Sequence, residues 1–277
     1  MAATTVPAQH IIASRDPGFG AQLQSEWTKL RSVRSTWIVT GLAVGLSIGF
    51  SAAVALAMGL TFDSWGAVEQ ATFDPITNSL TGLLFSLILL IVVGVTAVTS
   101  EYSSGMISTT FMISPQRARV FAAKAILVGV IGLLIHAIAV PGMFLVSQLI
   151  YGSYGIPTVS ITDTDATRFV VVVALVVPLS YTLISFSIAF LLRGTASAIT
   201  ASIGFMWLPF MLAPLLPAWI QQNVLRFLPD MANDSLSGLT PPGSLTYLSQ
   251  TPAIMVVAIW LVGSLALAGF VLNRRDV

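Results

Sequence analysis

The stretch EYSSGMISTTFMISPQRARVFAAK, residues 101–124, decides how this sequence is interpreted, because it is a polar island between two long apolar runs. It holds four of the chain's few charges, and Glu101 directly follows the uncharged run 75–100. Ser103, Ser104 and Gly105 come next, and such small and polar residues favour a turn over a membrane interior. We therefore expect the island to lie outside the membrane and to join two spanning helices.

The island divides into a turn, a short helix and the start of a longer helix. Three- and four-residue spacings, which give a short helix one apolar face, occur among Met106, Ile107, Thr110, Phe111 and Ile113. Ser114 followed by Pro115 is typical of a helix start, since the hydroxyl can accept an amide hydrogen bond and proline needs no donor there. The helix that follows carries Arg117, Arg119 and Lys124. The short helix is thus predicted to lie at the membrane surface.

The composition is that of an integral membrane protein. Of 277 residues, 56% are hydrophobic and only 8% are charged, whereas roughly a quarter of the residues in soluble domains are charged. The chain has no cysteine, which excludes a disulfide framework, a thiolate metal site and a cysteine nucleophile. The formal net charge is +1 and the basic residues are scattered, so nothing indicates nucleic-acid binding.

The segment before the first apolar run divides into a tail and an amphipathic helix. Residues 1–18 show no periodicity and are predicted to be a flexible tail, and no signal peptide is evident. Apolar side chains then recur at helical spacing at Phe19, Leu23, Trp27, Leu30 and Trp37, while Gln22, Glu26, Lys29 and Arg31 face elsewhere. Residues 19–34 are therefore predicted to form an interfacial helix, which meets the lipid headgroups through Trp27, Lys29, Leu30, Arg31 and Arg34.

Long apolar intervals predict an all-α protein with six membrane spans, because a helix needs about 20 apolar residues to cross the bilayer core. The intervals are about 37–60, 79–99, 122–150, 169–192, 196–217 and 252–272, within a single transmembrane domain over 19–277. Six spans place both termini on the same side. The basic residues of that side are Arg15, Lys29, Arg31, Arg34, Arg117, Arg119, Lys124, Arg193, Arg274 and Arg275, against Arg168 and Arg226 on the other. The positive-inside rule makes the first side cytoplasmic, with the tail and the island.

Three features of the spans and outer connections allow further predictions. A stripe of small residues, which lets helices approach closely, occupies Gly41, Gly45, Gly49, Ala53 and Ala57; it fits packing within one subunit and an interface between subunits about equally well. Prolines at 141, 178, 209, 214 and 217 predict kinks, as bent structural helices or as a gating hinge. The apolar piece Ile220–Leu228 is too short to cross the bilayer and is predicted to be an interfacial or re-entrant helix.

Residues suited to chemistry are scarce. The two lysines, Lys29 and Lys124, do not stand in a Gly-Lys-Ser/Thr context, so the chain has no P-loop and we expect no catalytic or cofactor-binding residues in it. His10 and His136 are far apart and lack ligand-spaced carboxylates, so no metal site is expected. His136 lies well inside a span and is either functional or a neutral imidazole that bonds a neighbouring helix. The spans otherwise lack the acidic residues of a proton relay.

Three stretches resemble the membrane subunit of an ABC-2-type ATP-binding-cassette transporter. They are SEWTKLRSVRSTW at 25–37, TSEYSSGMISTTFMISPQRARVFAAK at 99–124 and LLRGTASAI at 191–199. The resemblance covers nearly the whole chain in span count and loop placement. Many members of the family carry a basic residue where this chain has Ser108.

The resemblance implies a permease whose interfacial helix packs beside a cytoplasmic coupling helix. The coupling helix follows the first pair of spans (1–2) and precedes the next pair (3–4). The coupling segment would comprise Glu101, Tyr102, Ser103, Ser104, Gly105, Met106, Ile107, Ser108, Thr109, Thr110, Phe111, Met112 and Ile113. Apart from the resemblance, Glu101 either holds this segment through a surface ion pair with Arg119 or Lys124, which contributes at most about 1 kcal/mol, or simply marks the membrane boundary.

The function implied is that of the transmembrane subunit of an ATP-driven exporter in a bacterial inner membrane. Its partners would be a separate ATPase subunit, which binds ATP and Mg, a second permease copy or a sister permease, and membrane lipids; this chain itself would hold no cofactor. The apolar spans suit a lipid, an amphipathic compound and a hydrophobic peptide equally well as cargo. A secondary carrier or channel, and a non-transport membrane anchor or immunity protein, are the alternatives.

Overall fold

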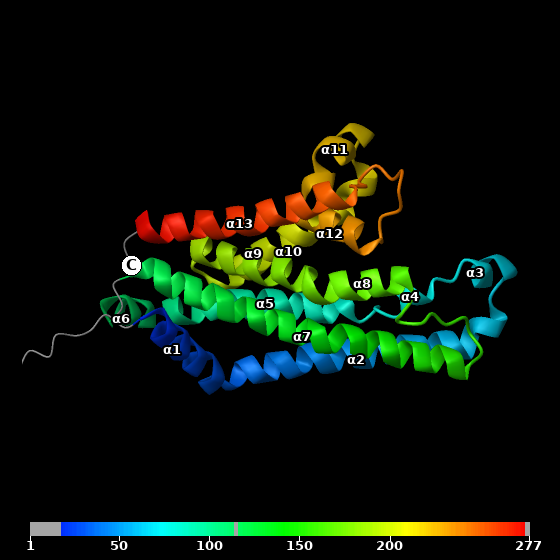
Figure 1. Cartoon of the computed structure of the whole chain (residues 1–277), viewed down its shortest axis with the longest axis horizontal. Coiled ribbons are helices and arrows are strands. Elements are labelled where there is room, and N and C mark those ends of the chain that lie inside the picture. The colour runs from blue at the N-terminus through cyan, green and yellow to red at the C-terminus, as the bar shows by residue number, and fades with distance from the viewer. Residues whose placement is uncertain (1–17, 114–115, 275–277) are drawn as a thin grey trace, which may run out of the picture.

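The computed structural model describes residues 18–113 and 116–274, and within these ranges it contains helices and no strands (Figure 1). Six helical segments of the described chain are long and apolar enough to cross a membrane: Arg34–Ser64, Leu83–Ser103, Arg117–Ser153, Thr164–Leu192, Thr195–Leu215 and Gln250–Arg274. The prediction of an all-α membrane protein with six spans is confirmed. The predictions on the tail before Gly18, on Ser114 and Pro115 and on Arg275 lie outside the described residues.

The six spans are built from seven α-helices, two of which continue into a 3-10 turn. The first span is α2 (Arg34–Thr61) with Phe62–Ser64, the second is α5 (Leu83–Ser103) and the third is α7 (Arg117–Ser153). The fourth joins α8 (Thr164–Leu175) to α9 (Val177–Leu192), the fifth is α10 (Thr195–Leu212) with Ala213–Leu215, and the sixth is α13 (Gln250–Arg274). The helix of the fourth span is interrupted at Val176, just ahead of Pro178, whereas Pro141 lies inside a continuous α7.

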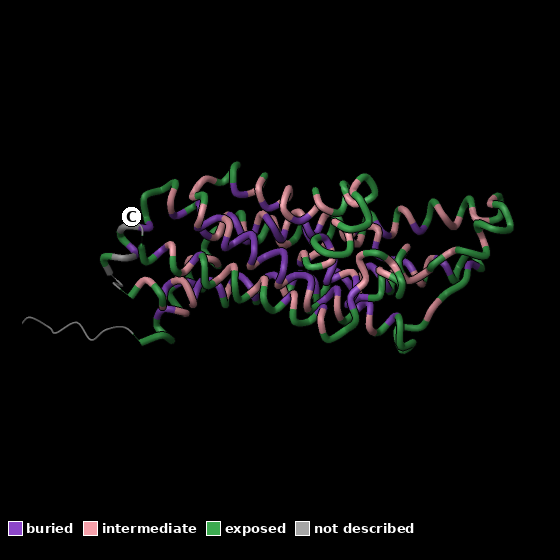
Figure 2. The backbone as a smooth tube through the Cα atoms, turned by 90° about the horizontal axis from the view of Figure 1, so that it is seen from above, coloured by how far each residue is buried: buried purple, intermediate pink, exposed green. Residues whose placement is uncertain are grey.

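The core lies in a central layer formed by α5, α7, α8 and α9, flanked by α2 on one side and by α13 on the other (Figure 1). Figure 2 shows the buried residues gathered along the middle of the bundle. Gly94 of α5 faces α9 so closely that an added Cβ atom would lie 2.3 Å from the Thr182 carbonyl oxygen. A side chain of any size there would separate the two central helices. α2, α10 and α13 bury much less of their surface within the chain.

Short helices gather at the two ends of the bundle. The start of α1 (Phe19–Ser32), α6 (Met106–Ile113) and the last turn of α13 lie at one end, while α3 (Ala67–Ala71), α4 (Pro75–Asn78) and α11 (Ala218–Asn223) lie toward the other (Figure 1). The first group is the end that the charge pattern predicts to be cytoplasmic. We call it the inner end.

The joint between α1 and the first span differs slightly from the prediction. α1 ends at Ser32, Val33 is extended (φ −87°, ψ 109°), and α2 already begins at Arg34. Arg34 therefore belongs to the first turn of the span, rather than to the interfacial helix predicted over 19–34. The single extended residue forms an elbow between the two helices (Figure 1).

The last outer connection differs more. The apolar piece Ile220–Leu228 is divided between α11 and the 3-10 turn Leu225–Phe227, instead of forming one helix. The following segment forms α12 (Pro229–Ser237), which packs against α8, α9, α10 and α13. Arg168 of α8 holds its C-terminal end, donating from Nε to the Leu236 carbonyl (2.7 Å) and from Nη2 to the Ser235 carbonyl (2.8 Å).

Candidate functional site

Both lysines of the chain and two of its three glutamates come together at the inner end of the bundle. Glu26 and Lys29 lie on α1, Glu101 lies in the last turn of α5, and Lys124 lies in the second turn of α7. We call these four residues the charge cluster. It links three helices whose sequence positions are up to 98 residues apart, and its net charge is zero.

Each lysine of the charge cluster contacts both carboxylates. Lys29 Nζ lies 2.7 Å from Glu26 Oε1 and 3.1 Å from Glu101 Oε1. Lys124 Nζ lies 2.7 Å from Glu26 Oε2 and 2.9 Å from Glu101 Oε1. Lys29 also donates to Thr110 Oγ1 of α6 at 3.3 Å. The contacts therefore connect α1, α5, α6 and α7 at one point.

The charge cluster is buried, which makes its pairing obligatory. Glu26, Glu101 and Lys124 are less than 5% exposed, and removing a charge from water costs several kcal/mol unless an opposite charge compensates it. Although burial opposes the shift, Lys124 and Lys29 hold the pKa of Glu26 below its usual value. Burial lowers the pKa of Lys29, but the carboxylates of Glu26 and Glu101 outweigh this effect, so the pKa of Lys29 is raised above its usual value. The charge cluster thus favours the ionised forms of Glu26 and Lys29.

The ion pair expected between Glu101 and Lys124 is present, but the prediction of a surface pair was wrong. α1 packs against α7 and covers the pair, and its Glu26 and Lys29 add two charges to it. The sequence shows the four charges, but it does not show that α1 folds back over them. A surface pair would contribute little, whereas loss of one member of a buried pair is strongly destabilising.

The predicted coupling segment forms one compact unit beside the charge cluster. Glu101–Ser103 end α5, Ser104 and Gly105 form a turn, and Met106–Ile113 form α6, as the spacing predicted. Gly105 has a φ of 69°, in the left-handed region that favours glycine. Ile107 and Thr110 are buried against the bundle, whereas Thr109 and Met112 are exposed. α6 is thus attached by one face and presents another outward.

α1 is oriented with its polar side toward the protein. Gln22 and Glu26 are buried against α7, while Phe19 and Trp27 are each 39% exposed. An amphipathic helix on a soluble protein would do the opposite. The exposed apolar face suits contact with lipid at the membrane surface, and the other predicted residues of this helix, Leu30 and Arg31, lie near its C-terminal end.

The stripe Gly41, Gly45, Gly49, Ala53 and Ala57 is exposed along its whole length. An added Cβ atom at any of its three glycines would meet nothing within 4 Å. Packing of this stripe within the subunit is therefore excluded for the described residues. The face of α2 that packs inside the chain is a second series of small residues with the same spacing, Ala43, Ser47, Ser51 and Ala55, all of them 0% exposed.

His136 is fully buried in α7, and its Nδ1 lies 2.9 Å from the Val173 carbonyl of α8. That carbonyl is close to the interruption at Val176. The contact fits the structural interpretation of a neutral imidazole that bonds a neighbouring helix.

Sequence reasoning missed a pair of acidic residues on α12. Asp230 accepts a hydrogen bond from the Tyr181 hydroxyl of α9 (2.7 Å), which in turn accepts one from Trp207 Nε1 of α10 (3.0 Å). Burial raises the pKa of Asp230 to about 6, although the Tyr181 hydrogen bond opposes it, and burial and the Asp230 charge raise the pKa of Asp234 to about 8. The four-residue spacing of the two aspartates was the available signal.

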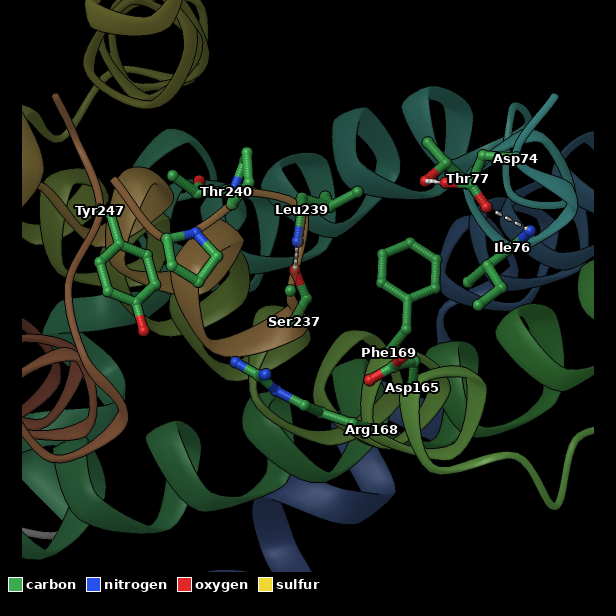
Figure 3. Close-up of a pocket in the computed structure, with 13 residues that line it drawn as sticks. Asp74, Ile76, Thr77, Asp165, Arg168, Phe169, Ser237, Leu239, Thr240 and Tyr247 are labelled. Atoms are coloured by element: carbon green, nitrogen blue, oxygen red, sulfur yellow. Dashed lines mark hydrogen bonds between the residues drawn. The ribbon is translucent and has the colours of Figure 1, made fainter. Parts of the chain in front are cut away.

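A cavity of about 440 Å³ opens at the outer end, between α4, α8 and the segment that follows α12 (Figure 3). Its charged groups mostly hold the protein's own backbone: Asp74 accepts from the Ile76 amide at the start of α4 (2.9 Å), and Arg168 caps α12. Among the described residues no group of three or more His, Cys, Asp or Glu side chains could hold a metal ion.

Comparison with known families gives one match. A family model described as "ABC-2 family transporter protein" matches residues 22–207, which is two thirds of the chain and includes most of α1, the charge cluster and α6. None of the curated proteins compared with the chain matches it.

Proposed function

Because the chain belongs to the ABC-2 transporter family and is a multi-pass membrane subunit rather than an ATPase, we propose that it forms the pathway of an ATP-driven exporter in a bacterial inner membrane. A separate ATPase subunit, which binds ATP and Mg, docks on α6. The attachment of α6 to the charge cluster is the observation that carries this proposal.

The contacts of α6 suit the transmission of force. α6 meets the bundle through Ile107 and through the hydrogen bond from Lys29 to Thr110. A displacement of α6 by a docked subunit acts on the charge cluster, which is common to α1, α5 and α7. These helices then move together, because separating any one of them would leave a buried charge unpaired. Differential affinity of the ATPase for the two arrangements supplies the bias toward outward transfer.

Met112 allows the docking surface to be tested without disturbing the fold. It is 76% exposed on α6, and Val68 on α3 at the opposite end is 78% exposed, so Met112→Asp and Val68→Asp are matched variants. A charge placed in an apolar docking contact reduces affinity by about 2 kcal/mol or more, roughly 30-fold. We expect Met112→Asp to remove the ATPase subunit from a pull-down of the tagged full chain, and Val68→Asp to retain it.

The measurement is mass spectrometry of the material that co-purifies in mild detergent, with an assay of its ATP hydrolysis. Retention of the ATPase by Met112→Asp would contradict docking through the outer face of α6. Purification of the intact chain with no nucleotide-binding subunit would contradict the proposed coupling and favour a carrier or an anchor.

The stripe on α2 supports a second permease in the working unit. Its small residues are exposed and form a smooth surface on which another helix could pack closely. Since the chain has no cysteine, Gly45→Cys gives a single reactive thiol on the stripe and Ser47→Cys gives a buried control. Oxidation in native membranes should form a disulfide between the introduced cysteines of two Gly45→Cys copies, and leave Ser47→Cys monomeric. If Gly45→Cys and Gly49→Cys both stay monomeric, the stripe faces lipid instead.

A further inference from the structure

An apolar groove of about 210 Å³ lies at the elbow between α1 and α2. α7 forms its floor and one wall with Ile131, Leu134, Ile135 and Ile138, and α2 contributes Thr40 and Val44. Trp27 and Leu30 of α1, with Trp37 of α2, close it toward the inner end. We call this site the elbow groove.

The elbow groove is open to the membrane. Leu134 and Ile138 on α7 are 55% and 59% exposed, and Trp37 is 54% exposed. Exposed isoleucine and leucine side chains on a spanning helix contact lipid chains, and tryptophan is typical of the headgroup boundary. The groove therefore runs from the headgroup level at the elbow into the hydrocarbon region, the path that a phospholipid acyl chain follows.

The rim of the groove carries positive charge that no carboxylate of residues 18–113 or 116–274 pairs with. Arg31 lines the groove, and Arg34 begins the adjoining helix. Both are exposed, and neither forms an ion pair with a carboxylate of the described residues. Lys29, two residues before Arg31, instead forms ion pairs with both carboxylates of the charge cluster. The chain thus pairs one set of cations and leaves the other at the headgroup level.

The elbow is fixed, which gives the site a defined shape. Trp37 Nε1 donates to the Arg31 carbonyl at 3.1 Å across the extended Val33. This bond joins the first turn of α2 to the end of α1 and so fixes the angle between the two helices. A headgroup at the elbow therefore lies near Arg31 at the end of α1 and Arg34 at the start of α2, three residues apart in the chain.

We propose that the elbow groove binds an anionic phospholipid of the inner leaflet, with an acyl chain between α2 and α7 and the charged headgroup at Arg31 and Arg34. The lipid fills the space beneath the C-terminal part of α1 and holds that helix against α7. It thereby supports the position of the charge cluster. Lipid binding here requires insertion in the membrane and does not depend on ATPase docking.

A second groove provides an internal comparison. It has a volume of about 360 Å³, lies between α9, α10 and α13, and is lined by apolar and small residues including Phe205 and Trp260, with no charged side chain. A lipid whose acyl chain enters this second groove meets no cation there that could select its headgroup. Of the two grooves, only the elbow groove has a cation in its lining that can select an anionic headgroup.

The test is native mass spectrometry of the purified full chain with equal amounts of phosphatidylglycerol and phosphatidylcholine. The wild-type chain should retain phosphatidylglycerol preferentially. Since one basic residue near an anionic lipid contributes a factor of about five, Arg31→Gln should lower the preference about five-fold, and Arg31→Gln with Arg34→Gln should abolish it. Arg274→Gln, at the same end but on α13, should leave it unchanged. Equal retention of the two lipids by the wild type, or an unchanged preference in the double variant, would overturn the proposal.

Tryptophan quenching gives a second readout that needs no arginine substitution. Phosphatidylglycerol with brominated acyl chains should quench the wild-type fluorescence more than brominated phosphatidylcholine does. Trp27→Phe with Trp37→Phe should remove this difference, because the remaining tryptophans lie elsewhere. A difference that persists in that variant would place the anionic lipid away from the elbow groove.

Discussion

Replacement of Lys124 by methionine should destabilise the protein far more than the loss of an ordinary cation. Lys124 is 4% exposed and pairs with both Glu26 and Glu101 at 2.7 and 2.9 Å. Lys124→Met keeps the length and most of the volume of the side chain, but leaves the cluster with two carboxylates and only Lys29. Its net charge changes from 0 to −1 in a buried place, and breaking such a pair costs about 3–5 kcal/mol.

A second substitution separates charge imbalance from lost packing. Lys124→Met with Glu101→Gln returns the net charge to zero and leaves the pair of Glu26 and Lys29 (2.7 Å) in place. Replacement of a whole buried pair by neutral groups is often close to neutral. We therefore expect the double variant to lie within about 1–2 kcal/mol of the wild type and well above the single variant.

Thermal unfolding in mild detergent, followed by tryptophan fluorescence, provides the measurement. For a chain of this size each kcal/mol shifts Tm by about 2–4 °C, so Lys124→Met should lower Tm by about 6–20 °C. Arg34→Met removes an exposed cation that pairs with no carboxylate in the described part of the chain, and it should change Tm by no more than about 2 °C. A Lys124→Met variant that melts with the wild type, or a double variant that melts no higher than the single one, would refute this account.

Two further predictions concern the rest of the bundle. Gly94→Ala places a Cβ atom 2.3 Å from the Thr182 carbonyl oxygen and should lower the free energy of unfolding by about 1–3 kcal/mol. In the control Gly45→Ala the added Cβ atom meets open space, so this variant should be neutral or slightly stabilising. Equal Tm values for the two variants would contradict the close packing of α5 and α9. Because the pKa values of Asp230 and Asp234 are raised in the folded state, the folded protein binds more protons than the unfolded chain from about pH 4 to 8. Their contribution to stability is therefore greatest below pH 4 and is lost as pH rises through 6 and 8, so Tm should fall from pH 5 to pH 9, and Asp234→Asn should flatten that decline.

The all-α class, the six spans and α6 follow from the sequence because each depends on local properties. Spans need long apolar runs, and the runs of this chain are interrupted by short polar segments. α6 was predicted over residues that the structure assigns to Met106–Ile113, because a turn precedes it and its apolar side chains keep helical spacing. The family resemblance rested on the same polar segments, and residues 22–207 match the family.

The burial of charge and the direction of faces could not be predicted in this way. α1 turns its polar face inward because Glu26 finds Lys124, which is 98 residues away in the chain, and no local pattern records that contact. The two series of small residues on α2 have the same four-residue spacing, so spacing alone cannot show that Ser47 is inside and Gly45 outside. α12 escaped notice because it is polar, and its burial depends on Tyr181 and Arg168 of another span.

The sequence by itself therefore determined that this chain is a six-span helical membrane protein with a short surface helix after its second span. Hydrophobicity and helical spacing act over tens of neighbouring residues, so they can be read along the chain. Only the tertiary structure decided that α1 covers a neutral cluster of four buried charges. The physical reason is that the cost of burying a charge depends on which opposite charges the fold brings within about 3 Å.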